Sequence, residues 1–412
     1  MSHPFGDLLS QHLHRKHGLS QAKLAAGILQ DPSIIGKMCK GRRLNGPQAR
    51  ERVCAIIDWL REAMRFLNRW RMPLIFVVSG GAVMLALGTR TPGAFITDRL
   101  KRLLLPLVFG MIVLVPPQVY LERLWRGQFT GSYLQWLPQA FDGVYPAGNM
   151  SWHHLWFLAY VLVLTLALLP FFLWARSAAG RAAMLSAGRF VARTHLQWAM
   201  VLPLAASVLW LAPLSYNTNG LIGDWHGLVY YGALLLYGAF LFGSADLLAA
   251  LQRQRFLSLS IGVAAYAALY IAFIGGAVRP VIPADLRPGF ALLSAVNTMA
   301  WLFAIIGFAH RHLVRRPAFL AEATEAIYPF YLLHQTVTVI AVYWLLTLGM
   351  PPILGFFGAV LATFVGTWAI YAGLVRPWRW VRPLFGMKAW RSRNGREWCA
   401  AAGSLPRPPS SL

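Results

Sequence analysis

The chain alternates long apolar segments with short polar connections. Nine segments, each about 20 residues long, have the length that an α-helix needs to cross a hydrocarbon core of roughly 30 Å. They cover residues 72–88, 103–121, 154–174, 197–213, 226–243, 257–276, 290–309, 327–348 and 354–375. The first is the weakest, because it is short and contains Gly80 and Gly81. The pattern predicts an all-α, polytopic membrane protein of about nine helices, preceded by a small soluble helical head.

The composition agrees with this prediction and excludes an ordinary soluble protein. Hydrophobic side chains make up 57% of the 412 residues, and the mean hydropathy is +0.52. Residues 1–30 are polar and amphipathic, so we expect no cleavable signal peptide. The spacing of Cys39, Cys54 and Cys399 fits neither a disulfide framework nor a metal site. We therefore expect no bound metal and no permanently bound cofactor.

The net charge of +24 is typical of nucleic-acid binding, but its distribution has a membrane explanation. The connections 89–102, 175–196, 244–256 and 310–326, together with the tail 376–412, hold 21 of the 38 Lys and Arg residues. The intervening connections 122–153, 214–225, 277–289 and 349–353 hold 4. This asymmetry is the positive-inside pattern. It predicts a multi-pass protein of the inner membrane whose first set of connections is cytoplasmic. We expect the basic tail, residues 381–412, to be cytoplasmic and disordered.

The head, residues 1–65, differs from the rest of the chain. Its stretch LSQAKLAAGILQDPSIIGKMCKGRR (19–43) resembles the helix-turn-helix of Cro and phage repressors, although its turn is longer than usual. The resemblance implies DNA contacts from Gln21, Ser33, Lys37, Lys40, Arg42 and Arg43. A small basic helical bundle without a DNA target is the alternative.

Topology argues against a DNA-binding role. Nine spans with a cytoplasmic C-terminus place the head outside the cytoplasm, where it meets no DNA. Three explanations remain open: one span is missing, residues 72–88 do not cross, or the head is a foreign piece joined near residue 62. We favour the last, with the true first span lost.

The membrane body, residues 66–380, carries four motifs in order. They are FLNRWRMPLIFVVSGG (66–81), FITDRLKRLLLP (95–106), HHLWFL (153–158) and IYPFYLLHQ (327–335). This ordered set resembles the membrane acyltransferase family 3, and within it the glucan biosynthesis protein C type. The resemblance implies an O-acyltransferase that takes an acyl group from an acyl-CoA co-substrate in the cytoplasm. Succinyl is one candidate acyl group, and a periplasmic glucan or another sugar would be the acceptor.

The residue types fit this chemistry. Acyl transfer to a hydroxyl needs a base, and imidazole titrates near working pH. Candidate catalytic residues are His334, within an apolar helix, and the pair His153 and His154 at the outer end of another. Alternatively, His334 is structural and the pair lies in an aromatic belt. Arg99 and Arg102 lie one turn apart at a cytoplasmic helix end, where they bind acyl-CoA phosphates or simply anchor the helix.

One departure from the family pattern bears on activity. Family members carry an arginine and, about ten residues later, a histidine in the first membrane helix, and this histidine is the presumed base. No histidine lies between residues 18 and 152 of this chain, so the enzyme is expected to be impaired if that base is essential. A membrane-tethered DNA-binding regulator is the second hypothesis. A transporter is the third, although the chain shows no internal repeats and no charged residues in mid-span.

Overall fold

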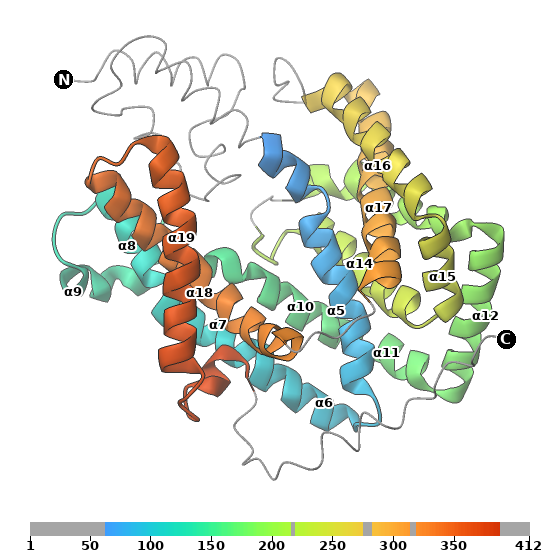
Figure 1. Cartoon of the computed structure of the whole chain (residues 1–412), viewed down its shortest axis with the longest axis horizontal. Helices are drawn as coiled ribbons and strands as arrows, with labels where there is room; N and C mark the ends of the chain where they lie inside the picture. The colour runs from blue at the N-terminus through green and yellow to red at the C-terminus, as the bar shows by residue number, and fades with distance from the viewer. Residues whose placement is uncertain (1–61, 216–218, 275–281, 314–318, 388–412) are drawn as a thin grey trace.

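The computed structural model describes residues 62–387, apart from 216–218, 275–281 and 314–318 (Figure 1). The described residues form helices and no β-sheet, with one isolated bridge between Val144 and Met150. The prediction of an all-α protein is thus confirmed. The predicted head and the tail beyond residue 387 lie outside the described residues.

Helices long and apolar enough to span a membrane follow one another through the described residues. Eight of them qualify singly, and a bent pair makes a ninth if it counts as one span. The single spans are Glu62–Leu87, Pro92–Trp125, Leu196–Leu214, Trp225–Phe242, Arg255–Phe273, Ala284–His312, Phe319–Thr347 and Ile353–Val375. The bent pair joins His153–Ala167 to Leu169–Arg176 at an angle of 59°. All nine predicted segments therefore correspond to helical spans, which is what a multi-pass membrane protein requires.

The first span is longer than predicted. It starts at Glu62 rather than at residue 72, with a turn at Arg69 and Trp70 before helix α5 (Arg71–Leu87). The extra turns are held by tertiary contacts that hydropathy does not register. Phe66 packs edge-on against the rings of Tyr266 and Trp301, with ring centroids 5.2 and 5.0 Å away.

The second span is interrupted twice by prolines. It consists of α6 (Pro92–Arg99), α7 (Leu105–Phe109) and α8 (Pro116–Trp125), separated by π-helical turns at Leu100–Leu104 and Gly110–Leu114. A proline cannot donate to the preceding turn, so a neighbouring carbonyl needs another partner. The carbonyl of Leu114 accepts from the Gln118 amide (3.1 Å) and from the Thr336 hydroxyl (2.7 Å). The span is thus broken at Pro116, and the bond from Thr336 to the Leu114 carbonyl ties it to α18 (Phe319–Thr347).

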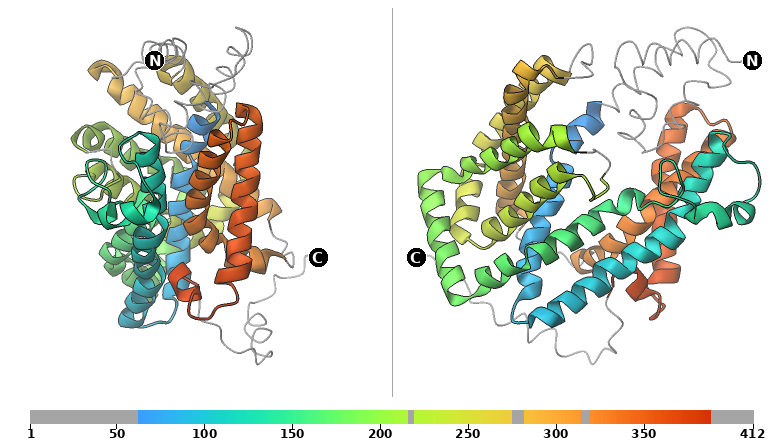
Figure 2. Two further views of the ribbon diagram at one scale, coloured as in Figure 1. Left: turned by 90° about the vertical axis from the view of Figure 1, so that its left-hand side faces the viewer. Right: turned by 180° about the vertical axis from the view of Figure 1, so that it is seen from behind.

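The remaining elements complete two groups of helices. They are α9 (Tyr133–Trp136), α10 (Trp156–Ala167), α11 (Leu169–Arg176), α12 (Ala178–Thr194), α13 (Val201–Ala206), α14 (Trp225–Phe242), α15 (Ala245–Arg253), α16 (Arg255–Leu269), α17 (Arg287–His312) and α19 (Pro352–Ile370). In Figure 1, α8, α18 and α19 stand on one side and α12 with α14–α17 on the other. Seen from behind, α6 and α7, with α10 and α11, run diagonally between the two groups (Figure 2).

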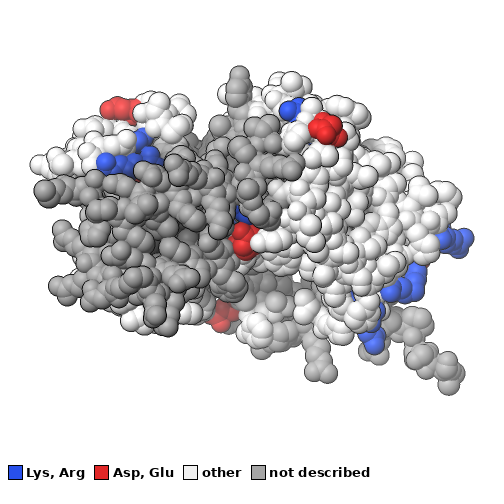
Figure 3. Space-filling view, turned by 90° about the horizontal axis from the view of Figure 1, so that it is seen from above, with Lys and Arg blue, Asp and Glu red and all other residues white. Residues whose placement is uncertain are grey.

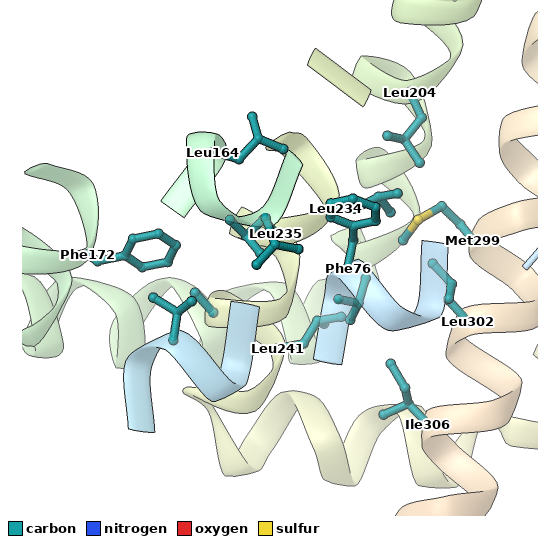
Figure 4. Packing of buried hydrophobic residues seen from close by; sticks show 14 of the residues in the cluster. Phe76, Leu164, Phe172, Leu204, Leu234, Leu235, Leu241, Met299, Leu302 and Ile306 are labelled. Atoms are coloured by element: carbon teal, nitrogen blue, oxygen red, sulfur yellow. The ribbon is translucent and has the colours of Figure 1, made fainter. Parts of the chain in front are cut away.

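Each group has its own buried core. The larger core is built from α5, α10–α15 and α17, around residues such as Phe76, Leu235 and Met299 (Figure 4). The smaller core is built mainly from α7–α10 and α18. Four partly buried side chains pack against both cores: Trp152, Phe157, Leu221 and Tyr328. The region around these four residues is therefore where the two groups of helices meet.

Glycines let α5 and α14 touch backbone to backbone. A Cβ at Gly80 would lie 1.9 Å from the carbonyl oxygen of Leu235, and one at Gly238 would lie 1.8 Å from that of Val77. Small residues commonly allow such close packing of membrane helices. Gly80 and Gly238 thus serve the close packing of these two helices.

The arginine-rich connections gather on one face, which we call the inner face. Hydrogen bonds link them in series: Arg176 to Gly88, Gln254 to His195, His310 to Gln252, and Arg376 to Glu322. The opposite, outer face includes connection 126–152 and residues 219–224, joined by a bond from the Trp152 indole to the carbonyl of Asn219 (3.1 Å). The alternation of faces expected from the charge pattern is thus present. Many apolar side chains are exposed along the described spans between the faces. Figure 3, which looks down on the molecule from above, shows few charged side chains on the described part of that face.

Candidate functional site

Two of the predicted histidines meet where the two helix groups join. The rings of His154 and His334 lie edge to face, with centroids 5.5 Å apart. His334 lies near the middle of α18, and His154 lies in the 3₁₀ turn His153–Leu155 that leads into α10. The hydroxyl of Tyr331 donates to the backbone carbonyl of His154 (2.6 Å) and fixes this turn against α18.

The hydrogen bonds decide which ring nitrogens carry protons. Nδ1 of His334 lies 2.8 Å from the carbonyl oxygen of Tyr331, and Nε2 of His154 lies 3.1 Å from that of Leu332. A carbonyl oxygen only accepts, so each of these nitrogens carries the hydrogen. In the neutral rings, Nε2 of His334 and Nδ1 of His154 therefore hold free lone pairs. The His154 Nδ1 atom is buried without a hydrogen-bond partner among the described residues.

Contacts along α18 give the depth of the pair. Near the outer face, Tyr343 packs edge-on against Trp125, with ring centroids 6.1 Å apart. His154 bonds at Leu332, which is eleven residues nearer the inner face, or about 17 Å along the helix at 1.5 Å per residue. The pair therefore lies deep between the two faces, and α10 starts at that depth. The connection between α8 and α10 folds inward to reach it.

A buried arginine holds this inward connection in place. The Arg123 guanidinium donates to four acceptors: Gln128 Oε1 (2.8 Å), Asn149 Oδ1 (3.0 Å) and the carbonyls of Pro146 (2.9 Å) and Gly148 (2.7 Å). Only 9% of the residue is exposed, so these bonds satisfy a charge that would otherwise be costly to bury. Arg123 thereby fixes the segment of the connection that leads into the 3₁₀ turn His153–Leu155.

His153 faces this connection rather than the histidine pair. Its Nδ1 lies 2.7 Å from the hydroxyl of Ser151, and its ring packs edge-on against Tyr145 at 4.9 Å between centroids. Its backbone has φ of 40°, which is uncommon for a residue with a side chain. The structure thus brings His154 and His334 together and directs His153 to the other side of the turn.

Tyr145 completes the connection through a carboxylate. Its hydroxyl donates to Oε1 of Glu122 (3.0 Å), and Glu122 also pairs with Arg126 (2.6 Å). Burial, and then the negative charge and hydrogen bond of Glu122, raise the pKa of Tyr145 to about 12. Tyr145 is therefore a neutral donor at physiological pH.

The predicted phosphate-binding arginines lie toward the inner face. Arg102 pairs with Asp98 (3.0 Å), which also binds Arg90 (3.1 Å). The Arg99 guanidinium lies over the Phe95 ring, 4.8 Å from its centroid, and its buried Nε has no hydrogen-bond partner among the described residues. Of the two predicted residues, Arg99 is thus the one whose charge no ion pair compensates within the described part of the chain.

Arg90, Arg99 and Arg102, which we call the arginine cluster, approach the histidine pair along α18. The Tyr328 hydroxyl donates to the backbone carbonyl of Arg102 (2.8 Å). Tyr328 precedes His334 by six residues, or about 9 Å along α18. The ring of Tyr331 lies between them, 6.4 Å from Tyr328 and 6.1 Å from His334 between centroids. The backbone at Arg102 therefore contacts α18 about 9 Å along the helix from His334.

The comparison with protein families decides the class of this protein. The family model described as an acyltransferase domain matches residues 49–372, which is most of the chain. The chain belongs to acyltransferase family 3. No curated protein and no solved structure matches it significantly. The match includes the histidine pair and the arginine cluster.

Several residues of this acyltransferase escaped the sequence prediction. Arg123, Glu122, Tyr145 and Gln118 position the site, yet each looks like an ordinary polar residue of a helix end or loop. Gln118 donates to Thr336, two residues after His334 (2.8 Å). Two prolines just before Gln118 were the available signal, because they free a carbonyl that needs a polar partner. The proposed DNA contacts at Gln21, Ser33, Lys37, Lys40, Arg42 and Arg43 lie outside the described residues.

Proposed function

We propose that this membrane acyltransferase moves an acyl group from an acyl-CoA at the inner face to a sugar hydroxyl at the outer face. The observation that carries the proposal is the His154–His334 pair, with two free imidazole lone pairs deep between the faces. Imidazole is the usual base for a hydroxyl nucleophile near neutral pH. Nε2 of His334 would act as the general base for the acceptor hydroxyl, and Nδ1 of His154 would accept a hydrogen bond from a neighbouring hydroxyl of the same sugar.

The reaction follows from these roles. Nε2 of His334 takes the proton of the sugar hydroxyl as its oxygen attacks the thioester carbon. The new carbon–oxygen bond forms, and the carbon–sulfur bond of the tetrahedral intermediate breaks. The imidazolium then returns the proton to the departing thiolate, which leaves as free coenzyme A. The bond from Nδ1 of His334 to the Tyr331 carbonyl favours the imidazolium at the intermediate stage.

The arginine cluster supports an acyl-CoA as donor. Arg99 lies toward the basic inner face, and guanidinium groups bind phosphates well. The resemblance to the glucan biosynthesis protein C type supports a periplasmic glucan or another sugar as acceptor, an inner-membrane location, and succinyl as one candidate acyl group.

The missing first-helix histidine bears on whether this chain is active. Within the described residues, the first span Glu62–Leu87 contains no histidine. We propose that His334, rather than a first-helix residue, supplies the base in this chain, so that it retains activity.

The test is an acyl-transfer assay on membranes that contain the full chain. Labelled acetyl-, succinyl- and dodecanoyl-CoA would be offered together with periplasmic glucan. His334→Ala should lower the rate at least about 100-fold, the usual contribution of a general base. The matched control is His312→Ala, which removes an exposed histidine at the inner face. If wild type is active and His334→Ala transfers at the same rate, the proposed base is wrong.

A further inference from the structure

A cavity of about 330 Å³ runs from the candidate site toward the outer face, parallel to α18. It lies between α18 and α19 and is lined by both helices. Its α18 wall includes a stripe with a four-residue spacing, which starts at Phe330 and continues through His334, Thr338 and Val342 to Leu346. His334 of the histidine pair thus lies near one end of the cavity, and the other end lies near the outer face.

The α19 wall combines a stripe of small residues at the same spacing with the larger residues Phe356, Val360 and Phe364. Gly355, Ala359, Thr363 and Thr367 follow one another along this wall. In membrane proteins such a stripe usually brings two helices into contact. Here the helices instead leave a cavity that is open on one side, where Val360 and Phe364 are exposed. Its volume falls within the range of small-molecule pockets, roughly 300–1,000 Å³. The small residues therefore leave space rather than fill it.

The polar groups of the cavity lie at its His334 end. Thr367 is completely buried, and its hydroxyl has no hydrogen-bond partner among the described residues. Thr338 and Thr363 bond to each other at 3.0 Å. Beyond them the walls are apolar as far as Met350. A ligand that fits has one polar end, near His334, and a long apolar remainder.

The direction of this polarity selects the occupant. A bilayer lipid of the outer leaflet would keep its head group at the outer face and bring only its chain end to His334. A thioester bound from the inner face has the opposite order: phosphates at Arg99, reacting carbonyl at His334, and hydrocarbon chain pointing outward. The second arrangement matches the polar end of the cavity with a polar group.

We propose that this cavity holds the hydrocarbon chain of the transferred acyl group, which makes the donor an apolar medium-chain acyl-CoA rather than succinyl-CoA. The inference rests on the proposed function, because it takes the histidine pair as the site of transfer. From His334 to Leu346 the cavity extends about 18 Å. An extended chain advances roughly 1.2 Å per bond, so acyl groups of about 8 to 14 carbons fit.

The first test is the chain-length preference in the membrane assay, with CoA esters from acetyl to hexadecanoyl and with succinyl-CoA. Wild type should transfer acyl groups in the range from octanoyl through tetradecanoyl faster than shorter or longer ones. Ala359→Leu fills the cavity away from His334 and should lower dodecanoyl transfer about tenfold while leaving butanoyl transfer within about twofold. Ala362→Leu is the matched control, because Ala362 is exposed on α19 and does not line the cavity. A preference for acetyl- or succinyl-CoA that Ala359→Leu does not change overturns the proposal.

The second test measures binding without turnover, so it separates this proposal from the proposed function. Dodecanoyl-CoA with a photoreactive diazirine at its chain end is irradiated with the full chain in nanodiscs. The label should fall on residues 342–360 and should be lost in Ala359→Leu but kept in Ala362→Leu. If wild type transfers no acyl group yet is labelled there, the reaction is wrong and the cavity assignment stands. If only a diazirine phospholipid labels the cavity, it is a bilayer-lipid site and the proposal fails.

Discussion

Replacing Arg123 with alanine tests whether the inward connection positions the site. Its guanidinium makes four hydrogen bonds from a nearly buried position. At about 1 kcal/mol net for each bond, the substitution removes about 4 kcal/mol that holds residues 127–152 against α8. Each 1.36 kcal/mol corresponds to a factor of about ten. The equilibrium constant between the connection packed against α8 and the connection released from it therefore shifts up to about 1,000-fold.

The expected result is a large loss of acyl transfer, about 100- to 1,000-fold, with faster hydrogen exchange in peptides from residues 140–155. Arg123→Lys should be intermediate, because an ammonium group has three donors in place of the guanidinium fork. The matched control is Arg126→Ala, which loses the same charge three residues later. Arg126 is partly exposed and makes one ion pair, so its loss should cost about 1 kcal/mol or less. Equal effects of Arg123→Ala and Arg126→Ala, or unchanged exchange in Arg123→Ala, would refute the reasoning.

Three further predictions concern other parts of the molecule. Gly80→Ala should lower stability by about 3 kcal/mol in thermal unfolding in detergent, because its Cβ meets the α14 backbone; Gly93→Ala, which meets nothing within 4 Å, is the control. Because the pKa of Tyr145 is raised from 10 to about 12 in the folded protein, its protonated hydroxyl contributes fully to the free energy of unfolding below pH 10, and this contribution is lost as the pH rises toward about 12. The unfolding temperature of Tyr145→Phe should therefore depend less on pH in that window. With the native cysteines changed to serine, Thr130→Cys should react with an impermeant thiol reagent on intact cells, and Arg181→Cys only after lysis; the reverse pattern would invert the topology.

The spans could be predicted from the sequence because a bilayer imposes a simple requirement. Every backbone group in hydrocarbon must bond within its own helix, so each crossing appears as about 20 apolar residues. The start of the first span could not be predicted in this way. Arg65 and Arg69 lower its hydropathy, yet both find partners: Arg65 pairs with Glu62, and Arg69 donates to Ser294. Such pairing depends on tertiary structure.

The candidate site was predictable in part. Its histidines stand out because imidazoles are rare in apolar helices, and their motifs resemble a known family. Their proximity could not be derived, because 180 residues separate His154 from His334. The inward fold of the connection depends on Arg123, which the charge count treats only as one of few basic residues on the outer side. The cavity beside α19 was also hidden, since a stripe of small residues usually indicates close packing.

The depth at which α10 begins has an electrical consequence. Along α18 only about 9 Å separates Tyr328, which contacts the backbone of Arg102, from His334. The arginine cluster on the inner side and the inward connection on the outer side therefore approach each other across this short length of α18, which forms a thin partition. A transmembrane voltage would then fall mostly across that partition. Moving one elementary charge through the full voltage changes its energy by about 2.3 kcal/mol per 100 mV. A succinyl carboxylate crossing there would make turnover depend on voltage, whereas a neutral fatty chain would pass without electrical work.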